Sequence, residues 1–159
     1  KEVSRIEDFV VVIDTSMSCS GDLVRCFLEE TYDVLCQSDS YFKKTNIHII
    51  QCDEQVQQDR LITNQEEMEA YMRDFTIIGQ GGTDFRPAFE YVNGMIRQGA
   101  FHRLKGLLYF TDGEGIYPVK RPVYDTAFVF LKDQYTDISV PAWAMKLIME
   151  PEQLTEGDK

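Results

Sequence analysis

Five short side chains that carry an oxygen donor follow apolar or glycine-rich segments of the sequence: Asp14, Ser16, Ser18, Thr83 and Asp112. Together they offer two carboxylates and three hydroxyls, which are hard donors of the kind that Mg²⁺ prefers. Mg²⁺ takes six oxygens at about 2.0–2.1 Å and often keeps some of its water. The set predicts a Mg²⁺ site, with Mn²⁺ and Ca²⁺ as alternatives, provided that the fold brings the segments together.

The first polar segment follows a run of residues, 9–13, that is apolar and mostly β-branched. Such a run predicts a strand buried on both faces, as in the centre of a parallel sheet. In a tight loop after it, Asp14, Ser16 and Ser18 can turn their short side chains towards one centre, while Met17 points away. The strand would therefore place a candidate metal loop at the end of a central strand.

The next elements follow from apolar spacing. Apolar residues between 23 and 35 recur at helical intervals and predict a helix that extends to about residue 37. Residues 46–52 and 56–62 are two extended runs joined by a short polar turn, which favours a hairpin whose second strand is antiparallel and at an edge. Residues 65–72 predict a short helix with Asn64 as its N-cap.

The second half of the chain continues the alternation of helices and strands. Residues 79–84 are too rich in glycine for regular structure and predict a loop that needs positive φ or close backbone approach. Residues 85–96 predict a helix with Pro87 in its first turn. Three further strands are expected at 106–110, 125–131 and 142–149, the last containing Trp143. The class is therefore α/β with a mostly parallel sheet.

In open α/β sheets, ligands bind at the carboxyl ends of the strands, where all three polar segments are expected to lie. Each segment also has a simpler interpretation. Ser16 and Ser18 could cap the following helix, Asp112 with Gly113 could form a turn, and Thr83 could belong to a plain loop. The coincidence of all three at strand ends of one sheet favours the metal site.

The pattern Asp14-x-Ser16-x-Ser18, then Thr83, then Asp112 resembles the metal-ion-dependent adhesion site of von Willebrand factor A (VWA) domains, which integrin I domains also carry. All five motif positions are filled, in the right order. Residues 109–118 and 140–145 look more narrowly like bacterial VWA-like proteins in which this domain follows a metallopeptidase-like region. The resemblance covers about residues 6–150. It implies a three-layer Rossmannoid fold with strand order 3-2-1-4-5-6, strand 3 antiparallel, and helices on both faces.

The resemblance also implies roles for the five residues. Ser16 and Ser18 would bind the metal directly, Thr83 directly or through water, and Asp14 and Asp112 largely through bound water. Few charged oxygens would then touch the ion, so a carboxylate of a partner protein could complete its coordination. The implied function is Mg²⁺-dependent protein binding, and the partner implied is an ATPase of the MoxR-type AAA+ class.

Two other functions stay open. The domain could be architectural, packing on an N-terminal metallopeptidase-like region and using the metal to rigidify its loops. A less favoured alternative is metal-assisted phosphoester hydrolysis by Asp14 and Asp112. The sequence has neither H-E-x-x-H nor G-x-S-x-G, and His48 and His102 fall outside the expected crevice, so an enzyme is not expected. Asp84 and Glu114 flank the motif and are expected to be solvated loop acids.

Composition limits the partners. The 159 residues are 43% hydrophobic and carry 16 Lys and Arg against 27 Asp and Glu, a formal net charge of −11. Such a charge disfavours nucleic acid and anionic membranes as partners. No apolar run approaches the roughly 20 residues of a membrane span, and a cytoplasmic location is expected.

Four cysteines without a C-x-x-C pair are expected to be reduced, mostly buried thiols: Cys19, Cys26, Cys36 and Cys52. We expect residues 1–150 to form one domain and residues 151–159 a polar, frayed tail. Because the chain begins at Lys1, we expect it to be cut from the C-terminal part of a longer protein.

Overall fold

A computed structural model of the chain describes residues 7–35 and 45–150. Within these residues, six strands form one sheet in the order β3-β2-β1-β4-β5-β6. The strands are β1 Glu7–Asp14, β2 Thr45–Cys52, β3 Val56–Ile62, β4 Leu104–Phe110, β5 Asp125–Leu131 and β6 Met145–Met149. The helices are α1 Gly21–Leu35, α2 Gln65–Arg73 and α3 Arg86–Arg97. All pairings are parallel except that of β3 with β2, so the predicted strand order and orientation are confirmed.

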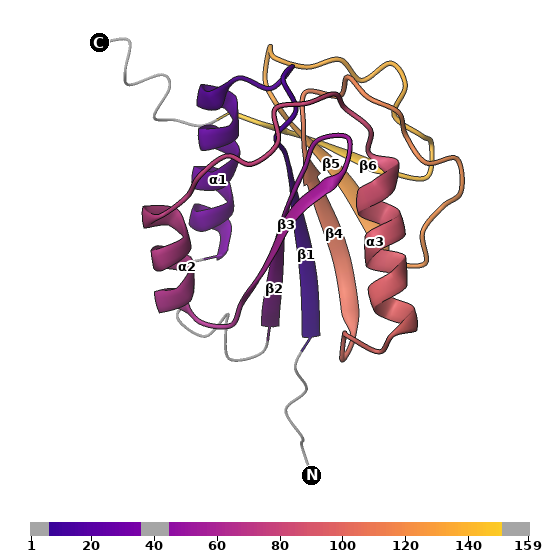
Figure 1. The fold of residues 1–159 in the computed structure, drawn as a ribbon. Coiled ribbons are helices and arrows are strands. Elements are labelled where there is room, and N and C mark those ends of the chain that lie inside the picture. The colour runs from indigo at the N-terminus through magenta and orange to yellow at the C-terminus, as the bar shows by residue number, and fades with distance from the viewer. Residues whose placement is uncertain (1–6, 36–44, 151–159) are drawn as a thin grey trace.

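Figure 1 shows α1 and α2 on one face of the sheet and α3 on the other, which gives the predicted three layers. Alternate residues of β1 pack on opposite faces of the sheet. Val11 and Ile13 belong to the core beneath α1, and Val10 and Val12 to the core beneath α3. All four are at most 1% exposed, as expected of a strand with neighbours on both sides and helices above and below. The central strand thus places Asp14 at the carboxyl-terminal end of the sheet, between β2 and β4.

Local sequence features produce the expected helix starts. Asn64 caps α2 by accepting a hydrogen bond from the backbone of Glu67 at 2.8 Å, and the Glu67 side chain accepts in return from the backbone of Thr63 at 2.7 Å. Pro87 lies in the first turn of α3, where its missing N–H costs nothing. Both helix starts are as predicted.

The last strand is shorter than predicted. Residues 142–144 form a turn, closed by a hydrogen bond from the backbone of Ala144 to the carbonyl of Pro141, and β6 begins only at Met145. Trp143 therefore lies before the strand, where its ring packs against Phe89 of α3 with centroids 6.2 Å apart. The apolar pattern that predicted a strand reflects packing onto α3 instead.

The thiols of Cys19, Cys26 and Cys52 are free and buried, as predicted. Cys36 and the tail 151–159 lie outside the described residues. Across 7–35 and 45–150, no helix is long and apolar enough to cross a membrane.

Candidate metal-binding site

The carboxyl ends of β1 and β4 bring the first and third polar segments together. Ile13 of β1 is paired with Phe110 of β4, so the residues that follow each strand lie side by side. Thr111 donates its hydroxyl hydrogen to Oδ2 of Asp14 at 2.5 Å, which joins two segments 97 positions apart in the chain. Thr111 was not among the predicted site residues, because a threonine before an aspartate carries no distinctive pattern.

Asp14 organises the loop that follows it. Its side chain is fully buried, and Oδ1 accepts a hydrogen bond from the backbone of Ser16 at 2.8 Å. This bond turns the chain so that the hydroxyl oxygens of Ser16 and Ser18 lie 3.1 Å apart. Met17, between them, is 74% exposed and points away, as predicted.

The glycine-rich loop is attached to the same segment by backbone hydrogen bonds. Gln80 donates to the carbonyl of Thr15 at 2.7 Å, and Met17 donates to the carbonyl of Gly81 at 2.8 Å. Gly79 has φ of +136°, and a Cβ there would lie 2.7 Å from Oγ1 of Thr15, so the predicted need for glycine is confirmed. The loop delivers Thr83, whose Oγ1 lies 3.5 Å from the Ser18 hydroxyl.

Asp53, directly after β2, positions the glycine-rich loop through a hydrogen bond to its backbone. Its Oδ2 accepts from the backbone of Gly81, and its Oδ1 from Gln55 and Gln57, each at 3.0 Å. Burial alone would raise the pKa of Asp53, but these hydrogen bonds outweigh it and lower the pKa. The sequence suggested only a turn at Asp53-Glu54, so this positioning role was missed.

Asp112 is held by the turn that follows β4. It is 6% exposed, and its Oδ1 accepts from the backbone of Glu114 at 3.0 Å. Gly113 has φ of +87°, and a Cβ there would collide with the carbonyl oxygen of Thr136. The turn proposed for Asp112 and Gly113 is therefore present, and it fixes the carboxylate at the sheet edge.

Negative charge gathers at this edge. One oxygen of Asp14, one of Asp112 and the Cys19 sulfur all lie within 4.8 Å of one another. Burial raises the pKa of Asp14, hydrogen bonds from Ser16 and Thr111 partly offset it, and the charge of Asp112 raises it further. Burial also raises the pKa of Cys19 and keeps the thiol protonated. Within the described part of the chain, neither carboxylate forms an ion pair.

The donor set fits a hard divalent cation. Two ligands at right angles, each about 2.1 Å from an ion, are about 3.0 Å apart. The hydroxyls of Ser16 and Ser18, at 3.1 Å, match that spacing, and the 3.5 Å from Ser18 to Thr83 is slightly wider. Both oxygens of Asp14 already accept a hydrogen bond from the protein, which suits contact with an ion through water.

The other acids and histidines that the sequence raised lie apart from these donors. Asp84 accepts two hydrogen bonds from the Arg86 guanidinium, at 3.0 and 2.8 Å, and so is paired rather than simply solvated. Glu114 is exposed. His48 contacts Asp59 at 2.9 Å within the sheet, and His102 lies before β4, so neither reaches the site.

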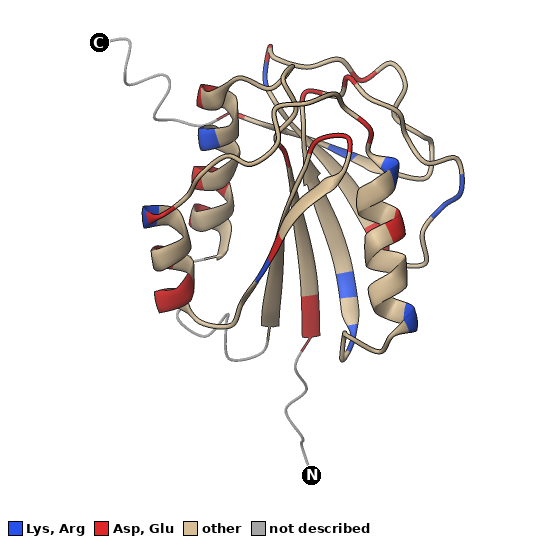
Figure 2. Ribbon diagram, in the orientation of Figure 1, with Lys and Arg blue, Asp and Glu red and all other residues tan. Residues whose placement is uncertain are grey.

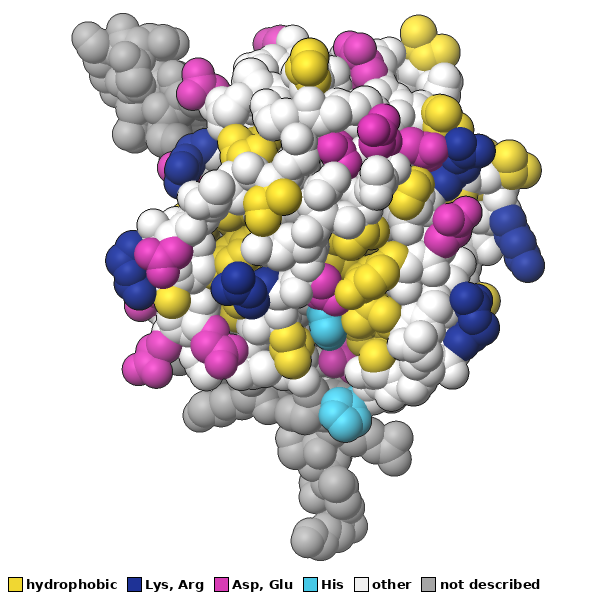
Figure 3. All heavy atoms as spheres, in the orientation of Figure 1, with side chains coloured by type: hydrophobic (Ala, Val, Ile, Leu, Met, Phe, Trp, Pro, Cys, Tyr) yellow, Lys and Arg dark blue, Asp and Glu magenta, His cyan; other side chains and the backbone are white. Residues whose placement is uncertain are grey.

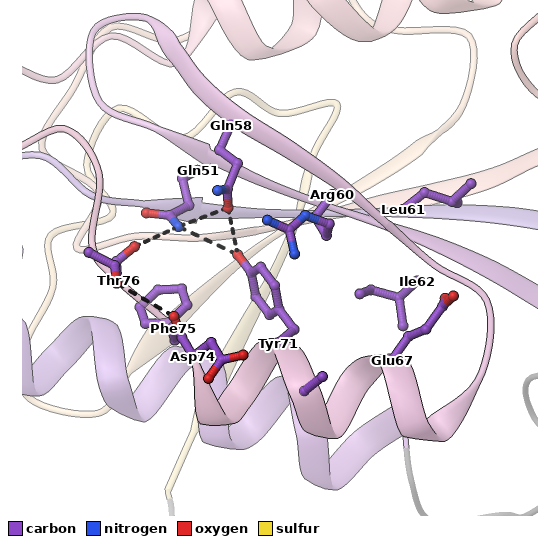
Figure 4. A pocket seen from close by; sticks show the side chains of 11 residues that line it. Gln51, Gln58, Arg60, Leu61, Ile62, Glu67, Tyr71, Asp74, Phe75 and Thr76 are labelled. Carbon is purple, nitrogen blue, oxygen red and sulfur yellow. Dashed lines mark hydrogen bonds between the residues drawn. The ribbon is translucent and has the colours of Figure 1, made fainter.

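A cavity of about 370 Å³ lies between β3 and α2, and one residue that lines it, Gln51, also contacts the segment before the glycine-rich loop. Figure 4 shows Gln51 among the lining residues, hydrogen-bonded to Gln58, Tyr71 and Thr76. Gln51 is 1% exposed and also accepts from the backbone of Ile78 at 2.8 Å. It therefore anchors the segment that leads into the glycine-rich loop, while none of the five predicted donors lines the cavity.

Solved structures share this fold. Proximal thread matrix protein 1 from the mussel byssus superposes with a TM-score of 0.72 at 12% identity, over 96% of this chain and 45% of that one. A second structure of that protein, with zinc in its metal-ion-dependent adhesion site (MIDAS) motif, gives a TM-score of 0.64 at 14% identity, over 96% of this chain and 46% of that one. A von Willebrand factor type A protein from Catenulispora acidiphila gives 0.66 at 13% identity, over 97% and 41%.

The chain thus spans less than half the length of these structures, and at such identities the likeness concerns the fold. No protein of curated function matches the sequence. The sequence matches one family over residues 9–150. This range includes every described helix, every described strand except the first two residues of β1, and all five candidate donors. The chain belongs to the VWA-like domain (DUF2201) family.

Proposed function

We propose that the domain binds a partner protein through a Mg²⁺ ion held at the sheet edge, with a carboxylate of the partner completing the coordination. The observation that carries the proposal is the convergence of three hydroxyls with two buried carboxylates that lack a basic partner among the described residues. VWA-like domains often mediate protein interaction through such a metal site, and the mussel structure with zinc in its MIDAS motif supports a divalent cation here.

Each residue has a distinct part in this proposal. Ser16 and Ser18 bind the ion through their hydroxyls, and Thr83 binds directly or through water. Asp14 and Asp112 act through bound water, with Thr111 orienting Asp14. A bound cation supplies positive charge in a region that is otherwise negative, so it can attract an acidic side chain. Neutral hydroxyl ligands leave most of that charge available to the partner.

The proposed role is non-enzymatic, as is general for VWA-like domains. We extend the proposal to a partner of the MoxR-type AAA+ ATPase class, which rests on the resemblance of the sequence alone. Mg²⁺ rather than another divalent ion is favoured by the all-oxygen donor set, although the neighbouring Cys19 sulfur would suit a softer metal.

Calorimetric titration with Mg²⁺ tests the metal site. We expect the wild type to bind, and Ser18→Ala to lose about tenfold or more in affinity because one hydroxyl ligand is removed. Ser18 is exposed, so the variant should fold normally. Ser139→Ala, an exposed serine in the loop before β6, is the matched control and should bind like the wild type. A wild type that binds no Mg²⁺ would contradict the proposal.

A second titration tests the role of the carboxylate. A fluorescein-labelled Glu-containing peptide should bind more tightly in Mg²⁺ than in EDTA, and its Gln counterpart should show no such gain. If Mg²⁺ binds but the Glu peptide gains nothing, the adhesion function fails and the metal serves only to rigidify the loops.

A further inference from the structure

A groove of about 490 Å³ runs between α3 and the loop 116–123, on the opposite face of the sheet from α1 and α2. One of its lining residues closely follows a candidate metal donor in the chain. Arg86, at the start of α3, lines one end of the groove and follows Thr83 by three residues, so their Cα atoms are at most about 11 Å apart. A partner segment that reached the metal could therefore continue into the groove.

The charge of this groove is opposite to that of the chain as a whole. Its lining includes four basic residues, Arg86, Arg97, Lys120 and Arg121, and one acidic residue, Glu90. The full sequence, in contrast, has 16 basic and 27 acidic residues. Figure 2 shows Lys and Arg on α3 and on the loop beside it, at the right of the view. The groove is a local site of positive charge on an acidic protein.

Most of this positive charge is available to a ligand. Arg86 is paired with Asp84 at 2.8 Å, whereas Arg97, Lys120 and Arg121 form no ion pair with any residue that the structure describes. Arg97 lies in the last turn of α3, where a cation also offsets the helix dipole. Lys120 and Arg121 have no such role within the described structure, which makes them the clearest candidates for contact with a partner.

Aliphatic side chains lie among the cations. Val119 is 96% exposed, Val123 is 89% exposed and Ile96 is 36% exposed. Figure 3 shows hydrophobic side chains beside Lys and Arg along this side of the molecule. Exposed apolar groups next to a hollow are typical of a protein-interaction surface.

The loop that carries these residues is restrained before any partner arrives. Tyr117 anchors its beginning by donating to the carbonyl of Gly113 at 3.0 Å and packing against Phe85, with ring centroids 4.7 Å apart. Pro118 and Pro122 then flank the basic pair, and each proline fixes its own φ. Less backbone freedom is lost when a restrained loop binds a partner.

We propose that this groove binds an acidic segment of a partner protein in which carboxylates alternate with small aliphatic side chains. The proposal deepens the proposed function and rests on it in one respect, because the same segment would supply the carboxylate at the metal. A peptide segment suits the concave shape and the mixture of cations with valines. An anionic membrane or a nucleic acid extends beyond the groove and would meet the negative charge of the rest of the domain, whereas a short acidic segment would contact the basic groove alone.

Fluorescence anisotropy with a short labelled peptide that alternates Glu with Leu and Ala tests the groove. The double variant Lys120→Glu/Arg121→Glu should bind the peptide about tenfold more weakly, since two attractions become repulsions. The matched control Arg73→Glu/Lys105→Glu makes the same change in net charge at the end of α2 and at the start of β4, and should bind like the wild type. Val119→Ser/Val123→Ser should weaken binding about threefold, and because both side chains are exposed it should fold normally.

Each outcome decides for or against the groove. A loss confined to the groove variants supports it, and equal losses in the control pair would reduce the effect to net charge and overturn it. Wild-type affinity in the groove variants, or binding of a Gln-substituted peptide as tight as that of the Glu peptide, would also overturn it. The proposal would likewise be overturned if the protein bound no peptide but sedimented with anionic phosphatidylserine vesicles.

Measurement in Mg²⁺ and in EDTA separates this proposal from the proposed function. The effect of Lys120→Glu/Arg121→Glu should persist in EDTA, whereas that of Ser18→Ala should disappear there. If Mg²⁺ tightens binding but the groove variants behave like the wild type, the groove fails and the metal function stands. If the groove variants lose affinity but Mg²⁺ changes nothing, the metal function fails and the groove stands.

Discussion

Asp14 and Asp59 both belong to strands of the same sheet, yet the fold shifts the pKa values of their carboxyl groups in opposite directions. Asp59 of β3 accepts hydrogen bonds from His48 of β2 at 2.9 Å and from the hydroxyl of Tyr91 of α3 at 2.5 Å. Burial alone would raise its pKa, but these bonds and the charge of His48 outweigh burial and lower it. Among the described residues, Asp14 has only neutral donors and a second carboxylate nearby, and its pKa is raised.

The contrast separates a structural acid from a candidate functional one. Asp59 joins β2, β3 and α3, and the protein itself supplies the groups that stabilise its charge. Asp14 is fully buried at the carboxyl ends of two central strands, and no described cation compensates it. A buried charge that the fold leaves uncompensated is costly unless a ligand stabilises it. The following substitutions test this distinction.

The largest expected effect is on metal binding by Asp14→Asn. The amide keeps the acceptor for the Ser16 backbone but removes the charge, so Mg²⁺ affinity should fall about 100-fold by calorimetry. In EDTA the same variant should melt at a higher temperature than the wild type, because it no longer buries a carboxylate without a cation. Equal melting temperatures in EDTA would contradict the view that Asp14 is held at a cost to stability.

Asp59→Asn should have the opposite effect on stability. Loss of the charged acceptor of His48 and Tyr91 should lower the free energy of unfolding by about 2 kcal/mol in urea titrations, while Mg²⁺ affinity stays unchanged. Asp33→Asn, an exposed acid on α1, is the control and should change stability by less than about 0.5 kcal/mol. If Asp14→Asn in EDTA and Asp59→Asn change the stability of the protein in the same direction, the distinction between the two aspartates is wrong.

Thr111→Val tests whether a neutral donor positions Asp14. The substitution removes the bonds to Asp14 and from the Gly113 backbone, so Mg²⁺ affinity should fall about tenfold. Thr126→Val in β5 is a matched control, because the Thr126 hydroxyl is buried without a hydrogen-bond partner within the described structure. That control should bind Mg²⁺ normally and be at least as stable as the wild type.

The smallest effect expected is in the pH dependence of stability. The pKa of Asp59 is lowered in the folded state from 3.8, so its stabilisation is fully present above about pH 4 and is lost as the pH falls through the folded pKa. The pKa of Asp14 is raised from 3.8, so its cost disappears as the pH falls through the folded pKa towards 3.8. In EDTA, the stability gain from Asp14→Asn should therefore shrink at acid pH, before the loss from Asp59→Asn does. Urea unfolding of the wild type, Asp14→Asn and Asp59→Asn in EDTA, at pH values above and below 3.8, measures how the stability effect of each substitution depends on pH.

The sequence by itself determined the order of elements and the five candidate donors. The β-branched run before Asp14 is typical of a buried strand, and the three glycines at positions 79, 81 and 82 disfavour regular structure. Such features act over a few neighbouring residues, so they are legible without the fold. The strand expected from residue 142 was wrong in part because the turn at Pro141 and the packing of Trp143 on α3 took precedence over local pattern.

Only the tertiary structure decided how the donors are held and where charge is left uncompensated. The bond from Thr111 to Asp14 spans 97 positions, and Asp53 reaches Gly81 across 28, so neither role has a local sequence pattern. The same holds for the groove, since Lys120 and Arg121 form a basic surface only when their loop passes beside α3. Burial and hydrogen bonding, which set the opposite pKa shifts of Asp14 and Asp59, depend on residues that meet only in the folded chain.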